Sequence, residues 1–483
     1  MTLLVGWRRW AVALAVASVI GLGVSPVTGV AQKALAAVPK TQTFFSQPSL
    51  HPPVVTLSGT DPDPQAGDVF AGVQNSIQAG PMIIDPQGQL VWFKAMRRSA
   101  ALNVELQRYK GRSVLTYWQG RVIQPGFGDG VDLVLDHSYR TVATVRAGHG
   151  YRADLHEFQI TSRGTALITA YGRVSANLTS LGGPRKASVL DSIIQEIDIA
   201  TGRVVWEWHA YGHVPLAHSC APRVRVPFDF FHINSIQQLR GGKVLVSSRH
   251  TCAVYAIEKR TGRILWTLGG KSSSFKMGPG TSLRFQHDAR MQPDGSITVF
   301  DNAGDLGAPA GRYSRALRIR LNYESKRATL VHAYRNDPPV LSPNEGSTQV
   351  LKDGNTFVSW GDEGPYYTEF GALPGAQQLF SLSFPKPVYS YRAYRFAWWG
   401  QPATRPSIAV SSSTIYASWN GATDVASWRG LAGPVPQALV PVGDFPKTSF
   451  ETAMTVASRG PYFAVNALDG AGHVLATSAT VRR

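Results

Sequence analysis

The sequence predicts an all-β protein: a six-bladed β-propeller followed by a small C-terminal β-sandwich. Three observations lead to this prediction. Runs of alternating apolar residues with glycine-containing turns recur along the chain, their spacing is regular, and no helical period of convincing length interrupts them. The length of 483 residues allows a large core and two domains.

Six segments have the pattern of a β-hairpin, with starts near residues 81, 131, 192, 253, 315 and 378, which lie 50 to 63 residues apart. A second series interleaves with the first and starts near residues 103, 156, 232, 287 and 347. Each unit therefore has two hairpins and four strands, and such units repeated around an axis form a β-propeller. The first unit needs one more strand, and we expect residues 48–75 or the run ending at Trp399 to supply it.

The N-terminal region has the pattern of a secretory signal peptide. Arg8 and Arg9 precede an apolar run over residues 10–24, and the small-residue triplet 34–36 follows. Residues 1–36 are therefore predicted to be removed, which makes the mature protein secreted or extracytoplasmic. An uncleaved membrane anchor is the alternative, but the run is shorter than the roughly 20 residues that span a bilayer. The arginine pair leaves a twin-arginine export route open.

The chain is strongly basic. Loss of Arg8, Arg9 and Lys33 with the signal peptide lowers the formal net charge from +17 to +14. This charge suits anionic ligands or anionic polymers of the cell envelope, and a solvated basic surface without a special partner is the alternative. Nucleic acid is a poor fit, because the basic residues are scattered and form no basic helix or aromatic-basic motif.

Cys220 and Cys252 are the two cysteines of the chain. An exported protein meets oxidising conditions, so we predict a disulfide between them, which could stabilise the fold by a few kcal/mol. It would tie the loop before His232 to the end of the strand that carries Arg249. Two unpaired buried thiols are the alternative.

Three histidines occupy the same place in successive units, at the head of the first hairpin: His156, His232 and His287. The innermost strand of each propeller blade faces the central channel, so a feature that recurs at its start converges on one place. We therefore expect the three imidazoles to meet at one mouth, although they are 76 and 55 residues apart along the chain.

The composition changes after Trp399. Residues 401–406 form a proline-containing linker. We predict that the propeller domain covers residues 48–402, and short alternating strands follow the linker over residues 407–483. These strands predict a fibronectin-like sandwich that packs on the propeller or binds the envelope. Trp419 and Trp428 could bind carbohydrate, although aromatic residues in such strands are more often core.

The segments DFFHINS (229–235), QHDA (286–289) and DLHEF (154–158), together with Arg249, resemble the bacterial arylsulfotransferase family over residues 50–402. The resemblance implies a propeller enzyme that moves a sulfuryl group from an aryl sulfate to a phenolic acceptor. It further implies a ping-pong reaction through a sulfohistidine, with no cofactor, no metal and no nucleotide sulfate donor PAPS. The loops are shorter than in the longer periplasmic members, so the range of acceptors does not carry over.

The resemblance gives each site residue a role. His287 corresponds to the nucleophile. His232, Asn234 and Arg249 would hold the sulfate oxygens, and His156 would complete the site and exchange a proton with the phenol.

Elementary chemistry agrees with these roles. A transferring sulfuryl group, like a phosphoryl group, spreads charge over three oxygens and needs positioning and fixed positive groups more than proton traffic. Neutral imidazole is a nucleophile near neutral pH, and the planar fork of Arg249 suits a tetrahedral anion. Asp288 could fix the tautomer of His287, but adjacent residues on a strand point to opposite faces.

Tyr366 and Tyr367 follow the fifth inner hairpin, and we expect them to line the same mouth and stack on an aryl ring. An ordinary loop is the alternative for this segment.

Three other functions compete with sulfuryl transfer. The segments TGRVVW and TGRILW are similar to repeats of quinoprotein propellers, but the sequence shows no calcium-binding cluster of acidic residues and asparagine. The three histidines could instead bind zinc. A noncatalytic envelope scaffold is the third alternative, and it leaves Arg249 and the aligned histidines unexplained.

Overall fold

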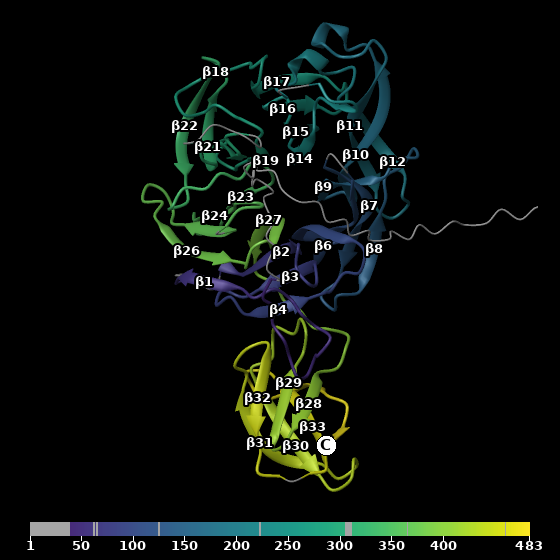
Figure 1. Ribbon diagram of the computed structural model, residues 1–483, viewed down its shortest axis with the longest axis vertical. Coiled ribbons are helices and arrows are strands. Elements are labelled where there is room, and N and C mark those ends of the chain that lie inside the picture. The colour runs from purple at the N-terminus through teal and green to yellow at the C-terminus, as the bar shows by residue number, and fades with distance from the viewer. Residues whose placement is uncertain are drawn as a thin grey trace, which may run out of the picture. The chain divides into compact units, whose positions relative to one another are not determined.

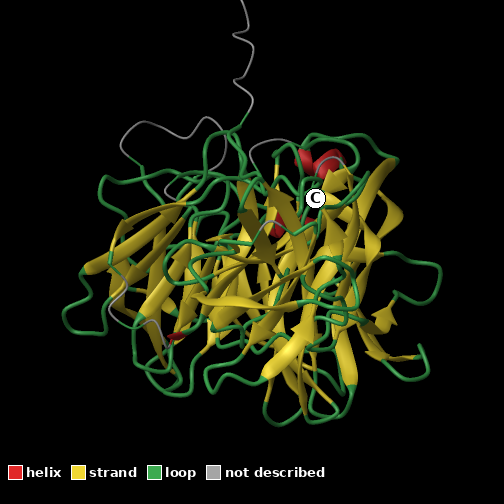
Figure 2. Ribbon diagram, turned by 90° about the horizontal axis from the view of Figure 1, so that it is seen from below, coloured by secondary structure: helices red, strands yellow, loops and turns green. Residues whose placement is uncertain are grey.

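The computed structural model describes residues 39–60, 63, 66–123, 126–221, 224–304, 312–364, 366–458 and 460–483. Strands dominate them, and helical structure is confined to short turns such as η2 (Thr179–Leu181) and η3 (Leu216–His218), as Figure 2 shows. The predicted all-β class is confirmed. The predicted signal peptide over residues 1–36 lies outside the described residues. Among the described residues, no helix is long and apolar enough to cross a membrane.

The strands from Asp68 to His209, together with one later strand, form three groups of four strands. The first group is β27 (Tyr389–Phe396), β2 (Asp68–Gln74), β3 (Gly80–Ile84) and β4 (Leu90–Phe93). The second is β5 (Ala100–Tyr109), β6 (Arg112–Ile123), β7 (Phe127–Leu135) and β8 (Thr141–Val145). The third is β9 (Ala153–Ile160), β10 (Thr165–Ala176), β11 (Ala187–Asp198) and β12 (Val204–His209), with β13 (Phe228–Asp229) beside β11. A pair between Gly130 and Ala153 joins the second group to the third.

Three further groups follow. The fourth is β14 (Ile233–Leu239), β15 (Lys243–Ser248), β16 (Ala253–Glu258) and β17 (Ile264–Gly269). The fifth is β19 (His287–Met291), β20 (Ile297–Asp301), β21 (Arg315–Asn322) and β22 (Arg327–Tyr334), with β18 (Lys276–Met277) beside β22. The sixth is β23 (Ser347–Val350), β24 (Thr356–Ser359), β25 (Tyr367–Phe370) and β26 (Gln378–Ser383), with β1 (Thr56–Gly59) on its outer edge.

The strand pairs match both predicted series of hairpins with one exception. The hairpin predicted from residue 378 is wrong, because β26 pairs with β25 and β1, whereas β27 pairs with β2. The segment before Trp399 therefore supplies the missing strand of the first group. Closure with a strand from the other end of the repeat removes an exposed sheet edge, which a local hairpin would have left open.

Neighbouring groups pack on one another through apolar clusters, and Figure 1 shows β9, β14, β19, β23 and β27 nearer the middle than the other labelled strands of their groups. The clusters join each group to the next, and the sixth group to the first. One pair from each cluster is Phe70 and Leu115, Val114 and Ile168, Ile194 and Val246, Leu245 and Val299, Phe300 and Val358, and Ala71 and Phe357.

Glutamines on the inner strands tie consecutive groups together. The side-chain oxygen of each accepts a hydrogen bond from a backbone N–H of the next inner strand, which gives a partly buried donor a partner. These bonds run from Ile160 to Gln107 at 2.7 Å, from Gln238 to Gln159 at 2.6 Å, from Met291 to Gln237 at 2.6 Å and from Arg395 to Gln349 at 2.7 Å.

Two sheets follow the linker. One is β28 (Ser407–Ser411), β29 (Thr414–Ser418) and β32 (Glu451–Thr455). The other is β31 (Val440–Pro446), β30 (Ser427–Gly433), β33 (Tyr462–Leu468), β34 (Val474–Thr477) and β35 (Val481–Arg482). Trp419 and Trp428 are 7% and 1% exposed and belong to the apolar cluster of this region, which agrees with the core alternative for these residues and not with a carbohydrate-binding surface. The Asn420 side chain accepts from the backbone N–H of Phe93 at 3.0 Å and donates to its carbonyl at 2.8 Å.

Candidate active site

The structure brings the three predicted histidines together. His156 lies within β9, His232 directly before β14 and His287 at the start of β19. The ring centroids of His156 and His232 are 4.9 Å apart. The ring centroid of Tyr391, on β27, lies 5.7 Å from that of His156 and 6.4 Å from that of His287. The inner strands of three successive groups therefore present one imidazole each to one place.

A buried carboxylate orients His156. The Nδ1 atom of this imidazole lies 2.6 Å from Asp154 Oδ2, which also accepts a hydrogen bond from Thr169 Oγ1 at 2.9 Å. Burial opposes ionisation of Asp154, but the contact with His156 and the other donors lower its pKa overall. Nδ1 of His156 therefore carries a proton, and Nε2 is the nitrogen left for chemistry.

A second carboxylate orients His232 in the same way. His232 Nδ1 lies 2.5 Å from Asp229 Oδ2, and the backbone N–H of His232 donates to Asp229 Oδ1 at 3.1 Å. His232 has a backbone φ of +52°, an unusual value for a residue other than glycine, which allows this turn back onto Asp229. Burial lowers the pKa of His232 and outweighs the opposing effect of Asp229.

Arg249 follows β15 and is 6% exposed. Its Nη2 atom donates to the carbonyl of Pro343 at 3.1 Å and to Asn344 Oδ1 at 2.9 Å. Its Nη1 atom donates to His250 Nε2 at 2.9 Å, and the guanidinium lies 4.8 Å from the ring centre of Phe285. These contacts hold the planar fork in one orientation, as recognition of a tetrahedral anion requires.

His250 is a positioning residue for Arg249 that the sequence did not single out. Its Nδ1 atom donates to the backbone carbonyl of Asp229 at 2.6 Å, so Nε2 is free to accept from Arg249. Burial lowers the pKa of His250 to about 3, which keeps this acceptor neutral.

Asp229, His232 and His250 are a possible metal-ligand group among the described residues, with ligand atoms within 4.8 Å of one another. This is a different set from the three histidines that the zinc alternative named. The Arg249 guanidinium uses the lone pair of His250 Nε2 and places a positive charge beside it. Both effects disfavour a metal cation there.

His287 differs from the other two histidines because an amide orients it. Its Nδ1 atom lies 2.7 Å from Asn302 Oδ1. The Nδ2 atom of Asn302 donates to the carbonyls of Ser342 and Glu345 at 2.9 and 3.0 Å, which fixes which end of the amide faces His287. Nδ1 of His287 is therefore the protonated nitrogen, and Nε2 carries the free lone pair.

The environment of His287 keeps its imidazole neutral. Burial lowers the pKa of His287 well below its ordinary value, and the nearby positive charge of Arg249 lowers it further. Asp288, considered above as the residue that fixes the tautomer, instead accepts from Arg290 Nε at 2.8 Å and from the backbone N–H of Thr348 at 2.9 Å. His287 is thus a buried, neutral imidazole with one nitrogen free, which is the form required of a nucleophile.

Asn234 is fully buried beside the histidines. Its Nδ2 atom donates to the carbonyl of Gln286 at 2.7 Å, which ties β14 to the residue directly before His287. Among the described residues, Asn234 Oδ1 has no hydrogen-bond partner. Its backbone carbonyl accepts a hydrogen bond from Arg392 Nη2.

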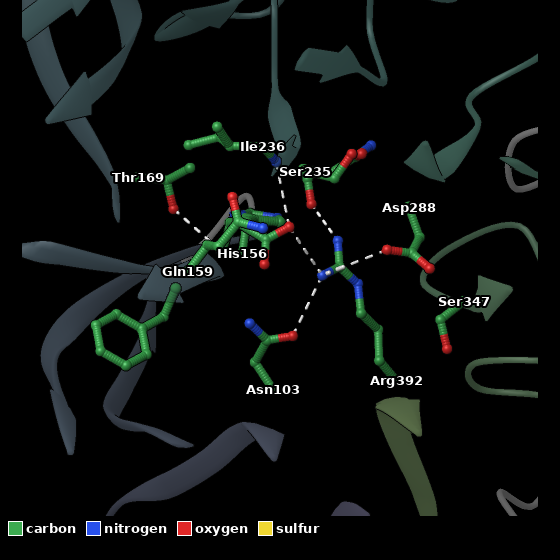
Figure 3. A network of polar contacts seen from close by, with 12 residues as sticks. Asn103, His156, Gln159, Thr169, Ser235, Ile236, Asp288, Ser347 and Arg392 are labelled. Carbon is green, nitrogen blue, oxygen red and sulfur yellow. Dashed lines mark hydrogen bonds and ion pairs between the residues drawn. The ribbon is translucent and has the colours of Figure 1, made fainter. Parts of the chain in front are cut away.

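Arg392, on the closing strand β27, is the centre of a buried polar network that Figure 3 shows. Its Nη1 atom donates to Asn103 Oδ1 at 3.2 Å and to Glu157 Oε2 at 3.4 Å, and lies 3.8 Å from Asp288 Oδ1. The side chain of Arg392 is fully buried, so these carboxylates and amides offset the cost of burying its charge. The network joins inner strands β5, β9, β14 and β19 to β27.

Tyr366 and Tyr367 lie in the apolar cluster between the first and sixth groups and are 2% and 0% exposed. The Tyr367 hydroxyl is 2.7 Å from Ser390 Oγ, and both rings pack near Phe384. The ring contacts found for these tyrosines do not include the three histidines, so their role in holding an aryl ring stays a prediction.

The predicted disulfide between Cys220 and Cys252 is confirmed. It lies directly beside the strand end that carries Arg249. The backbone N–H of Cys220 donates to the carbonyl of His250 at 2.6 Å, and that of Cys252 donates to the carbonyl of Arg249 at 3.2 Å. The crosslink therefore restrains the backbone that carries the guanidinium.

The sequence model of the family described as Arylsulfotransferase (ASST) matches residues 105–371, more than half of the chain. The chain belongs to the arylsulfotransferase family. Membership supports an aryl sulfotransferase type of activity in general, with small-molecule aryl sulfates and phenols as the substrate class. A comparison with curated proteins found no match.

Solved structures similar to this chain are distant in sequence. A protein of unknown function from Bacteroides caccae is 14% identical, with 68% of this chain and 97% of that chain covered and a TM-score of 0.43. The Cps50 (Swd1) β-propeller domain from Myceliophteria thermophila is 11% identical over 76% and 92% of the two chains, with a TM-score of 0.37. A virginiamycin B lyase from Staphylococcus aureus is 10% identical over 85% and 94%, with a TM-score of 0.27. These likenesses are too weak to bear on function.

Three polar residues of the site were missed at the sequence level: His250, Asn302 and Asn344. His250 directly follows Arg249 in the sequence, and this position could have indicated that it belongs to the site. Asn302 directly follows β20, two residues beyond Phe300, which pairs with His287. Because residues two apart on a strand share a face, the register of that hairpin could have placed Asn302 near His287. Asn344 lies 95 residues from Arg249 and had no comparable local signal.

Proposed function

We propose that this protein moves a sulfuryl group from an aryl sulfate ester to a phenol through a sulfohistidine at His287, without PAPS. The observation that carries the proposal is the Asn302–His287 pair: an amide of fixed orientation occupies Nδ1, which leaves the Nε2 lone pair of a neutral imidazole next to Arg249. Sulfuryl transfer requires such a nucleophile together with fixed positive charge.

In the first half-reaction, Nε2 of His287 attacks sulfur, the N–S bond forms and the bond from sulfur to the aryl oxygen breaks. The phenolate leaves with the bonding electrons and takes a proton from His156, whose charged form the Asp154 carboxylate stabilises. Arg249 and the second N–H of Asn234 Nδ2 donate to the sulfuryl oxygens, where charge is spread during transfer. His232 donates to them through Nε2 in its charged form, which a neighbouring anion favours.

In the second half-reaction, an acceptor phenol occupies the place that the first phenol left. His156 takes the phenolic proton as the oxygen attacks sulfur, and the N–S bond breaks with its electrons returning to His287. Each group is then restored to its starting state, so no external cofactor takes part in the cycle.

The fold supports a finer architectural proposal. Six groups of four strands, each packed on the next and closed by β27, support a six-bladed propeller over residues 48–402. The two sheets around one apolar cluster support a β-sandwich over residues 407–483. The Cys220–Cys252 disulfide supports an extracytoplasmic location, with residues 1–36 as the signal peptide.

The test is transfer from 4-nitrophenyl sulfate to a second phenol by the purified protein. Release of nitrophenol should accompany formation of the sulfated acceptor, and a ³⁵S-labelled donor without acceptor should label one peptide, the one that contains His287. His287→Ala should abolish both signals, whereas His332→Ala, on outer strand β22, should change neither.

Labelling of another histidine would move the nucleophile away from His287. If the native protein neither releases nitrophenol nor becomes labelled with aryl sulfates, the site would instead serve anion binding without catalysis.

A further inference from the structure

The four residues Ser342–Glu345 end one residue before the inner strand β23 and contact two side chains of the candidate site. We call them the 342–345 clamp. The carbonyls of Ser342 and Glu345 both accept from Asn302 Nδ2, at 2.9 and 3.0 Å, and so fix the amide that orients His287. Without these acceptors the amide could turn and present its donor end to His287 Nδ1.

The same clamp holds Arg249. The Pro343 carbonyl and Asn344 Oδ1 accept from Arg249 Nη2 at 3.1 and 2.9 Å. Arg249 belongs to the fourth group and His287 to the fifth, whereas the clamp leads into the sixth. A stretch of four residues thus touches both the guanidinium and the amide partner of the nucleophile.

The clamp is itself firmly held. Ser342 Oγ lies 2.8 Å from the Asn344 carbonyl and 2.9 Å from Asp362 Oδ1, and the backbone N–H of Ser342 donates to Ser314 Oγ at 2.8 Å. Glu345 has a φ of +65°, a conformation that a residue other than glycine keeps only where its surroundings impose it. At its far end, the N–H of Gly346 donates to the Tyr391 carbonyl at 3.0 Å, beside the histidines.

We infer that Asn344 is a positioning residue and that the clamp couples the anion-binding fork of Arg249 to the tautomer of His287. The inference rests on the proposed function and adds a residue from outside the histidine motifs. Asn344 suits this role because its amide oxygen is a neutral acceptor, which orients a guanidinium without neutralising its charge. An aspartate at the same place would keep the shape but would compete with a sulfate for Arg249.

The test compares Asn344→Ala and Asn344→Asp with the native enzyme. Loss of one hydrogen bond to a charged group should raise KM for 4-nitrophenyl sulfate about tenfold in Asn344→Ala. Asn344→Asp should raise KM further, although its side chain has almost the same volume. Asn336→Ala is the matched control, because Asn336 is a buried asparagine with two hydrogen bonds, to the Pro338 carbonyl and from Thr368, outside the site.

Coupling is tested separately, with a double-mutant cycle between Asn344→Ala and Asn302→Ala. Effects on kcat/KM that fall short of additivity are expected if both residues act through the clamp. Additive effects, or native KM values in both Asn344 variants, would overturn the inference.

Calorimetric titration with sodium sulfate gives a readout that needs no catalysis. The affinity should fall from native protein to Asn344→Ala to Asn344→Asp. This order in a protein that transfers no sulfuryl group would refute the proposed function while supporting the clamp. Equal sulfate affinity in all three proteins would refute the clamp, whatever the activity.

Discussion

Each histidine of the site uses Nδ1 for a hydrogen bond, but the acceptors differ in charge. Asp154 and Asp229 present carboxylates to His156 and His232, whereas Asn302 presents an amide to His287. A carboxylate stabilises an imidazolium, so it suits a residue that carries a proton. A neutral amide fixes the tautomer without favouring protonation, and so suits a nucleophile.

This difference predicts the pH dependence of Asn302→Asp. The pKa of His287 is well below its ordinary value, so the native nucleophile should stay neutral into the mildly acidic range. A carboxylate at position 302 raises that pKa, and protonation then removes the lone pair as the pH falls. The acid limb of kcat/KM should therefore move to higher pH, and activity on the acid side should fall about tenfold for every pH unit that the limb moves.

Profiles of kcat/KM against pH, measured for both proteins, check this expectation. Asn302→Leu is the companion variant, because it removes the acceptor without adding charge and should lower the rate at every pH. An unchanged acid limb in Asn302→Asp would mean that His287 does not titrate in the rate-determining state.

Asp132, on β7, predicts a pH effect on stability. Its side chain is fully buried, and among the described residues its carboxyl oxygens have no hydrogen-bond partner. Burial raises its pKa well above the ordinary value, and Asp154 adds to the effect. The folded state therefore disfavours the ionised form, and native stability should be lost as the pH rises from the unfolded pKa of about 3.9 through the folded pKa.

Asp132→Asn removes this ionisation at nearly constant shape. The variant should unfold at a higher temperature than the native protein at pH 8, and the difference should shrink towards pH 4. Calorimetric melting curves at both pH values check this, and a gain that does not depend on pH would point to packing instead of charge.

At the scale of elements, the local sequence pattern was sufficient to predict the hairpins, but it was not sufficient to predict which strand pairs with β2. Alternation of apolar residues and glycine turns are local, so both interleaved series were predictable, and with them the place of His156, His232 and His287 in the repeat. The pairing of β27 with β2 joins residues more than 300 positions apart, and a turn-like segment before β27 suggested a local hairpin instead.

The same distinction explains the site residues. His232 and Arg249 stand in a recognisable segment, whereas the contact between Arg249 and Asn344 crosses from the fourth group to the loop before the sixth. Tyr366 and Tyr367 looked like mouth residues because they follow an inner hairpin. The polar sequence around them gave no sign that their rings would be buried beside Phe384.

The Cys220–Cys252 disulfide gives an element-scale prediction. Replacing both cysteines with serine removes a crosslink over 32 residues and should lower the free energy of unfolding by about 3 to 4 kcal/mol in the chain-entropy model. Because the crosslink restrains the backbone at Arg249 and His250, KM for the sulfate donor should rise as well. Denaturant titration and steady-state kinetics check the two effects, and native KM in a destabilised variant would limit the disulfide to stability.

At the scale of the whole molecule, the centre is held by charge as well as by packing. Arg392 and Arg290 share Glu157 and Asp288 where the inner strands meet, with no solvent access for Arg392. Charged groups are costly to bury, so removing one partner leaves the remaining charges buried without compensation.

Arg392→Met should therefore lower the free energy of unfolding by about 3 to 5 kcal/mol, because Glu157 and Asp288 lose a buried cation. Arg429→Met is the matched control: it breaks a pair with Asp444 at 2.7 Å that is open to solvent, and it should change stability little. Denaturant titration of both variants checks the contrast, and equal losses would show that the central network is not special.

The closing strand also sets an order of events during synthesis. Tyr391 and Arg392 leave the ribosome after every histidine of the centre, and β2, which waits for its partner β27, is made more than 300 residues earlier. A nascent polypeptide that ends before β27 therefore lacks the strand that pairs with β2, and it also lacks the Tyr391 ring that lies near His156 and His287. We therefore expect catalytic activity and completion of the first strand group to require the same residues, Tyr389–Phe396.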